Sequence, residues 1–356
     1  MEKNHSTGSS APKDELVSLQ ALRAVAAVMI SLHHFAQLVH VHAPTNPVTW
    51  LLLERGPLFL DFFFVLSGFV IAITAERHVG RTWQFLVNRG VRIFPNYWFY
   101  TTLLVVSVAL MPPWSYLTSW TPRSLALSFF LVPHQNPNGY GLFPFLYTGW
   151  SLTYEVFFYG LVAACVAVAG KRGLPASIAI LVVLPFVFGS HHPLGPSNRI
   201  LLELAAGVVL QQTIPSWTRL PAAWKIVLFG SCAVATGILL ARGVFHPNLR
   251  LFVGAWGLAA AVSAEGFFRI RPRLSAVARW LGEMTYSVYL SHVVVLGWIV
   301  AAFGVPGTPW REAAVGAVYL CANLLVARTT FKLVETGRFP SMLKSILLRK
   351  GVGIRR

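Results

Sequence analysis

Long apolar segments separated by short polar ones dominate this chain. Such segments occur at 19–40, 58–76, 95–111, 150–169, 176–190, 199–213, 224–241, 249–267, 281–303 and 312–333. About 20 apolar residues in a helix span the hydrocarbon core of a bilayer. The pattern therefore predicts an all-α fold, a polytopic membrane helix bundle of about ten transmembrane helices. A shorter apolar piece, 124–132, precedes the loop PHQNPNGYG and is expected to form a re-entrant or interfacial segment.

Composition agrees with a membrane protein. Hydrophobic residues make up 55% of the 356 residues and charged residues only 12%, against about 25% charged residues in soluble domains. No segment outside the bundle is long enough to bury a core of its own. We therefore expect a polar cytoplasmic tail at 1–15, one transmembrane domain at 16–340 and a basic cytoplasmic tail at 341–356.

The net charge of +17 could indicate nucleic-acid binding, but the positions of the charges favour another explanation. If the N-terminus is cytoplasmic, 23 of the 29 Lys and Arg residues fall on the inner side of the predicted spans. Cytoplasmic loops of membrane proteins carry such an excess. The charge therefore predicts that both termini are cytoplasmic and contact anionic membrane lipids, with no nucleic acid as a partner.

The first apolar segment carries two candidate functional residues, Arg23 and His34. They are eleven residues apart, so on a helix they differ by about 20° from three whole turns and lie roughly 16 Å apart along the axis. His33 lies about 80° away from this face. A cation and an imidazole on one face are costly in lipid unless they line a protein interior. His34 is a candidate general base; the alternative is a histidine hydrogen-bonded inside the bundle.

A metal site is not expected in this segment. The histidines at 33, 34, 40 and 42 are not accompanied by a cluster of acidic residues or cysteines.

The run PLFLDFFFVLSGFVI places Asp61 near the outer end of its span, with Ser67 about two turns deeper. An acidic residue inside a membrane segment is a functional candidate by default. Asp61 and Ser67 are therefore candidates for a supporting role in catalysis or for binding a substrate. The alternative for Asp61 is an ion pair with a neighbouring helix.

Arg89 and Arg92 lie in the segment FLVNRGVRIFPNYW and share a face if this segment is helical. Together with Arg23 they are predicted to form a cytosolic cluster that holds phosphate groups, which planar guanidinium groups bind well. The alternative is the ordinary excess of positive charge on the inner side.

Two further segments carry candidates. In GWSLTYEVFFYG, Glu155 lies among aromatic residues and could orient an imidazole, accept a proton or bind sugar hydroxyls, while Trp150 and Tyr154 could stack on a sugar ring. The alternative for Glu155 is a pairing with a membrane arginine. In WLGEMTYSVYLSH, His292 lies about eleven residues from the cytoplasmic edge, near the membrane midplane.

Together these motifs resemble the membrane-bound acyltransferase-3 family. The resemblance rests on the pair Arg23 and His34, LFLDFFFVLSGF, Arg89-x-x-Arg92, WSLTYEVFFY and LGEMTYSVYLSH. They occur in the family's order and cover about residues 16 to 340. The family's usual Glu-Lys-Pro ending is matched only loosely by 334–337, so Glu335 is not among the candidates.

The resemblance implies an O-acyltransferase in the bacterial inner membrane, most similar to members that O-acetylate exopolysaccharides. It implies an acyl-CoA donor, usually acetyl-CoA, no permanently bound cofactor, and a carbohydrate or glycolipid acceptor. It also implies that Arg23 and His34 are essential and that Arg89 and Arg92 are important.

In the resulting hypothesis, His34, assisted by Glu155 or Asp61, activates the acceptor hydroxyl. Direct attack and a two-step acyl-histidine relay are both compatible with the sequence, which also leaves the oligomeric state open. One alternative is an acyltransferase acting on a macrolide or another small metabolite. A more distant one is a proton-coupled transporter, although no inverted repeat is evident.

Overall fold

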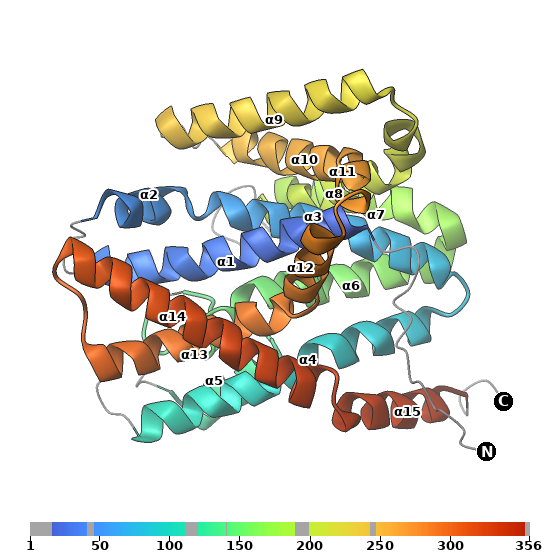
Figure 1. Cartoon of the computed structure of the whole chain (residues 1–356). Coiled ribbons are helices and arrows are strands. Elements are labelled where there is room, and N and C mark those ends of the chain that lie inside the picture. Colours follow the sequence, from blue (N-terminus) through green and yellow to red (C-terminus); the bar gives the residue numbers. More distant parts are fainter. Residues whose placement is uncertain are drawn as a thin grey trace, which may run out of the picture.

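The computed structural model describes residues 16–40, 46–110, 120–139, 141–188, 199–242 and 247–352. All regular elements within these ranges are helical (Figure 1), which confirms the predicted all-α class. The predicted tail at 1–15 lies outside the described residues. The elements are α1 (Val17–His40), α2 (Pro47–Arg55), α3 (Leu58–Arg77), α4 (Thr82–Leu110), α5 (Pro122–Phe129), α6 (Gly149–Ala169), η2 (Gly170–Arg172), α7 (Gly173–Val187), α8 (Ile200–Thr218), α9 (Ala222–Arg242), α10 (Pro247–Ser263), α11 (Glu265–Arg269), α12 (Pro272–Glu283), α13 (Thr285–Phe303), α14 (Pro309–Thr330), η3 (Phe331–Glu335) and α15 (Arg338–Val352).

Within the described residues, six helical segments are long and apolar enough to cross a membrane by length and composition. Three shorter apolar helices, within α8, α9 and α10, accompany them. One of the six segments, Gly149–Val187, contains α6 and α7 joined by a short turn. The predicted spans at 150–169 and 176–190 are therefore two separate helices. The bundle confirms the membrane-protein character, whereas the number of about ten crossings stays a prediction.

Helix α1 occupies the centre of the bundle. It packs against α2, α3, α10, α12, α13 and α14. In Figure 1 it runs between α3 on one side and α13 and α14 on the other. The helix α9 lies at the periphery, where α10 is its main neighbour. Side chains of α1 therefore reach the interior in several directions.

Glycines allow α3 and α8 to pack closely, and this is the most extensive contact between any two described elements. A Cβ added to Gly68 on α3 would meet the backbone carbonyl of Leu204. A Cβ added to Gly207 on α8 would meet the backbone of Val65 and Phe69. Small residues permit such backbone contact between membrane helices. This contact fixes α3, which carries Ser67, against the rest of the bundle.

Several helices begin at identifiable caps. Asn46 accepts a 2.9 Å hydrogen bond from the backbone amide of Val48 at the start of α2, and Thr121 forms a capping box with Ser124 in α5. The beginning of α1 is different. There the Glu265 carboxylate of α11 accepts a 2.9 Å bond from the backbone amide of Ser18. The start of the central helix is thus stabilised by a distant part of the chain.

The short segment expected at 124–132 forms α5, which has eight residues and is followed by an irregular stretch. Its end is attached to α4. The Tyr97 hydroxyl donates to the carbonyl of Ser128 at 2.8 Å, and the indole of Trp98 donates to the carbonyl of Phe129 at 2.9 Å. The irregular stretch thereby leads back into the bundle ahead of α6.

Two boundaries differ from the sequence-based expectation. The helix α4 begins at Thr82 and continues through Pro95, so Arg89 and Arg92 lie on the same helix as the span predicted at 95–111. Much of the segment predicted as a basic tail at 341–356 belongs to α15. That helix packs on α4, where the Trp83 indole donates to the carbonyl of Leu347 at 3.2 Å.

We predict that Gly207→Ala destabilises the protein, because the added methyl group would push α8 away from α3. Overpacking of this kind costs about 1–3 kcal/mol. The midpoint of thermal unfolding in detergent should fall. It is measured by size-exclusion chromatography of samples heated to a series of temperatures. The matched control is Gly160→Ala on α6, where nothing lies within 4 Å of the added Cβ. Equal midpoints for both variants would contradict the proposed close packing.

Candidate functional site

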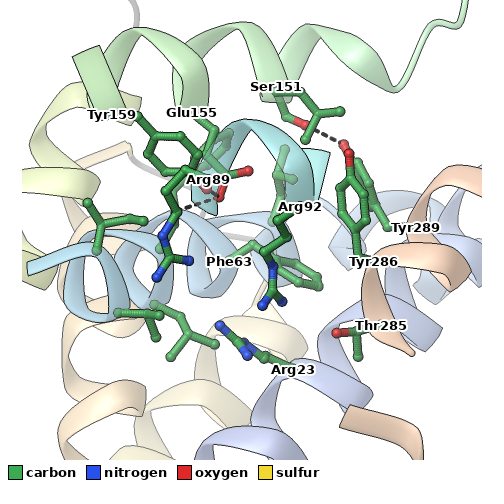
Figure 2. A pocket seen from close by; sticks show the side chains of 17 residues that line it. Arg23, Phe63, Arg89, Arg92, Ser151, Glu155, Tyr159, Thr285, Tyr286 and Tyr289 are labelled. Carbon is green, nitrogen blue, oxygen red and sulfur yellow. Dashed lines mark hydrogen bonds between the residues drawn. The ribbon is translucent and has the colours of Figure 1, made fainter. Parts of the chain in front are cut away.

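Five helices surround a cavity that contains three of the predicted arginines. The space amounts to about 760 Å³, including its part open to solvent, and its walls come from α1, α3, α4, α6 and α13. Arg23 contributes from α1, and Arg89 and Arg92 contribute from α4. Figure 2 shows the three guanidinium groups turned toward one shared space.

The cavity has an excess of positive charge. Its charged lining residues are the three arginines and Glu155, which gives a formal charge of +2. Arg89 donates to the Thr74 hydroxyl, while its buried Nε has no hydrogen-bond partner among the described residues. A buried donor without a partner is costly and marks a position where a ligand could supply the missing acceptor. This arrangement suits an anionic ligand with several oxygen acceptors.

Glu155 lies on the wall of the same cavity. It accepts a 3.0 Å hydrogen bond from the Ser67 hydroxyl and a further bond from Tyr159. All three residues line the cavity, and Glu155 and Tyr159 are labelled in Figure 2. The structure thus brings Ser67 and Glu155 together. It corrects one expectation, because Glu155 is bound to Ser67 and Tyr159 and is absent from the described contacts of His34.

A second carboxylate, Glu335, was missed by the sequence analysis. It accepts a 2.7 Å hydrogen bond from Ser287 on α13 and a 3.4 Å bond from Asn96 on α4. It also interacts electrostatically with Arg92 and Arg23. Glu335 ends the π-helical turn η3, and only the loosely matched motif at 334–337 pointed to it. It is a counter-charge for the arginine cluster from the far end of the chain.

The two candidate histidines of α1 and α13 form a pair. The ring of His34 stacks on that of His292, with centroids 4.9 Å apart and an interplanar angle of 24°. The Nδ1 of His34 lies 2.8 Å from Oε1 of Gln37. The Nδ1 of His292 lies 2.6 Å from the carbonyl of Tyr289, so this nitrogen carries the hydrogen. The structure therefore joins two residues that are 258 positions apart in the sequence.

His33 points elsewhere, as the helical phase predicts. Its Nδ1 lies 3.0 Å from the carbonyl of Leu52 on α2, and its side chain closely approaches Gly56. His33 is buried and connects α1 to α2. Among the described residues, no group of three or more His, Cys, Asp or Glu side chains is arranged to hold a metal ion. His42 lies outside the described residues.

The histidine pair lies next to the cavity but does not line it. Tyr289 belongs to the cavity wall and also contacts the histidine pair, because its ring centroid is 5.6 Å from that of His292. The Tyr289 hydroxyl lies 2.7 Å from the Ser151 hydroxyl, a contact drawn in Figure 2. Its ring is also 6.0 Å from that of Phe63. Tyr289 thus connects the wall of the arginine cavity with His292.

Buried polar contacts fix the helices that carry the two histidines. Ser291 on α13 donates to the Asn323 amide oxygen at 2.6 Å, and the Asn323 amide nitrogen lies 3.3 Å from the Ser31 hydroxyl. Tyr319 donates to the carbonyl of Ser31 at 3.1 Å. These residues hold α1, α13 and α14 together inside the bundle. Such contacts between membrane helices each contribute about 0.6–2 kcal/mol.

The position of Asp61 contradicts the expectation that it assists His34 or an acceptor. Asp61 forms a two-pronged ion pair with Arg250 on α10, with distances of 2.7 and 2.8 Å. Asp61 is buried, and the pair connects α3 to α10. A buried carboxylate needs such a partner. The alternative interpretation, an ion pair between helices, is therefore the correct one.

The aromatic candidates Trp150 and Tyr154 pack in a cluster instead of lining the arginine cavity. Trp150 lies 6.1 Å from Tyr154 and 6.3 Å from Phe143, measured between ring centroids. The ring that faces His34 is Tyr147, edge-on at 5.7 Å. Burial raises the pKa of the Tyr147 hydroxyl, so this group remains a hydrogen-bond donor at neutral pH. Tyr147 and Phe143, stacked at 5.1 Å, were not predicted.

Comparisons with known proteins identify relatives. A family model described as an acyltransferase domain matches residues 16–329. The chain is similar to the exopolysaccharide production protein ExoZ of Rhizobium meliloti (strain 1021), with 26% identity over 289 residues. That similarity covers 77% of this chain and 89% of the relative. No solved structure matches the chain.

We predict that the arginine cavity binds inorganic pyrophosphate. The ligand should raise the thermal unfolding midpoint of the detergent-solubilised protein, and this effect should weaken with added salt. Arg92→Gln should weaken the apparent affinity about tenfold, the effect of losing one charged hydrogen bond. The control is Arg81→Gln, at an exposed arginine that does not line the cavity. Undiminished stabilisation of the Arg92→Gln variant would rule out this binding site.

Proposed function

This chain belongs to the acyltransferase family defined by that domain, and we propose that it moves an acyl group from a cytosolic acyl-CoA to a carbohydrate hydroxyl. The acyl group is acetyl in this proposal. The acceptor is an exopolysaccharide or its lipid-linked precursor, and the enzyme lies in a bacterial inner membrane. The observation that carries the proposal is an arginine-lined cavity directly beside a stacked pair of histidines.

The positive charge of the cavity supports acyl-CoA as the donor. Coenzyme A carries a pyrophosphate and a further phosphate, and guanidinium groups bind such oxygens in pairs. Arg23, Arg89 and Arg92 supply three cations at one cavity. The inner-side excess of Lys and Arg supports a cytoplasmic opening for this cavity. In this orientation the donor enters with its phosphates at the arginines.

The thioester must then reach His34. The pantetheine arm would extend from the cavity past Tyr289, which lines the cavity and whose ring lies beside that of His292. It would bring the carbonyl carbon beside Nε2 of His34. Holding both reactants in this geometry removes part of the entropic barrier to reaction.

The chemistry assigned to His34 is general-base catalysis. Its Nε2 accepts the proton of the acceptor hydroxyl while the hydroxyl oxygen bonds to the thioester carbonyl carbon. The carbon–sulfur bond breaks, and sulfur leaves with the electron pair as a thiolate, which recovers the proton from the imidazolium. In the two-step variant, the same Nε2 first takes the acyl group and then passes it to the acceptor. Both routes need an Nε2 lone pair.

A similar protein and the aromatic residues near His34 support a carbohydrate acceptor. The similar protein from Rhizobium meliloti is named for exopolysaccharide production. Near His34, the stacked rings of Tyr147 and Phe143 supply apolar faces, and Tyr147 adds a hydroxyl donor. Such rings combine an apolar body with a polar tip. These properties suit a sugar, which has apolar C–H faces and many hydroxyls.

We predict that transfer from acetyl-CoA depends on Arg23 and His34. In purified protein reconstituted into lipid nanodiscs, His34→Ala should lower the rate about 10²–10⁴-fold. Arg23→Gln should chiefly raise the KM for acetyl-CoA. The matched control is His33→Asn, which keeps a donor for the carbonyl of Leu52 and should retain most activity. Equal loss in the His33 and His34 variants would contradict the assignment.

We also predict that deleting the gene removes O-acetyl groups from a surface polysaccharide. Mass spectrometry of polysaccharide from the deletion strain should show the loss, and complementation with the wild-type gene should restore it. Complementation with the His34→Ala variant should fail. Unchanged O-acetyl content would contradict a polysaccharide acceptor and would favour a small secondary metabolite.

A further inference from the structure

The hydrogen bond between His34 and Gln37 determines which nitrogen of His34 is basic. Gln37 follows one helical turn after His34 on α1, and its Oε1 lies 2.8 Å from Nδ1 of His34. An amide oxygen can only accept a hydrogen bond. The Nδ1 of His34 therefore carries the hydrogen, and the lone pair resides on Nε2. This is the tautomer that the proposed reaction requires.

The neighbouring rings fix the orientation of the imidazole in the other directions. His292 stacks against one face of His34, and Tyr147 meets it edge-on. His292 is itself immobilised, because it is completely buried and bound through Nδ1 to the carbonyl of Tyr289. Stacking limits tilting of the His34 ring, and the bond to Gln37 limits its rotation. Together these contacts aim Nε2 in one direction.

The charge of the partner matters as much as its geometry. Gln37 is neutral, so it selects the tautomer without adding a carboxylate to a membrane-spanning helix, where a charge is costly. The titratable groups around His34 are His33 on α1, His292 on α13 and Tyr147 ahead of α6. None of these three groups is a carboxylate. The basicity of His34 is therefore sensitive to any change of charge at position 37.

We infer that Gln37 is a positioning residue: it holds His34 in the tautomer and orientation that present Nε2 to the acceptor hydroxyl. This inference rests on the proposed function, in which His34 is the base. Gln37 does not touch the reacting atoms, and its side chain is exposed while that of His34 is half-buried. Its role is similar to that of the acidic residue in catalytic triads, with a neutral amide in place of the carboxylate.

The test compares two substitutions at position 37 by their dependence on pH. Gln37→Leu removes the acceptor for Nδ1, and kcat should fall about 10–100-fold with little change in the KM for acetyl-CoA. Gln37→Glu keeps an acceptor but adds a negative charge, which stabilises the imidazolium. The acidic limb of the kcat profile, measured between about pH 5 and 9, should then move upward by about one pH unit. Above that limb, Gln37→Glu should recover most of the activity lost in Gln37→Leu.

The controls separate this role from a general effect on folding. Gln212 is an exposed glutamine on α8 and lies outside the cavity. Gln212→Leu and Gln212→Glu should leave both kcat and the acidic limb unchanged. Unfolding midpoints, measured for all four variants, identify any loss of folded protein, and rates are expressed per folded enzyme.

Different results would overturn the proposed function and the positioning role of Gln37. If His34→Ala remained active, the proposed function of His34 would be wrong. If His34→Ala were inactive while both Gln37 variants had the wild-type rate and pH profile, only the positioning role of Gln37 would be overturned. A loss of rate in Gln37→Leu and Gln37→Glu without a shift of the acidic limb would also overturn it, because that result indicates packing alone.

Discussion

The structure depends on keeping three like charges together inside a helix bundle. Arg23 and the two arginines of α4 repel one another, and cations are expensive in an apolar environment. Two carboxylates oppose this repulsion from different helices: Glu155 on α6 and Glu335 in η3. Each carboxylate is oriented by hydroxyl groups, from Ser67 and Tyr159 in one case and from Ser287 in the other. An additional anion would complete the compensation, which explains why the cluster suits a phosphate-bearing ligand.

The same requirement explains the arrangement of the helices around α1. The arginine cavity and the histidine pair must both contact α1, because Arg23 and His34 lie about three turns apart on it. Polar contacts of Ser31 and Asn323 hold α1 against α13 and α14. Glycine packing holds α3 against α8. The bundle therefore uses backbone contact and buried hydrogen bonds to hold the reactive side chains in position.

Asp61 and Glu335 illustrate how buried carboxylates can be misinterpreted from sequence. Both are acids associated with apolar segments, and Asp61 is in the more conspicuous motif. Yet Asp61 is neutralised by Arg250, a residue 189 positions away, whereas Glu335 lies beside the arginine cluster. The function of a buried acid depends on its partner. That partner is chosen by helix packing, which no local pattern reveals.

The sequence alone determined the class of the protein, because apolar length and the position of charges follow directly from the cost of burying polar groups in lipid. It also separated His34 from His33, since helical phase depends only on local geometry. The tertiary structure decided which residues meet: His34 with His292, Ser67 with Glu155, and Glu335 with the arginines. Gln37 lies one turn after His34 on the same helix, so its proximity is local, and the structure adds that its Oε1 lies within hydrogen-bond distance of Nδ1 of His34. The pairing of Arg23 with His34 was predictable because both lie on one helix, whereas His292 and Glu335 were not, because they come from other elements.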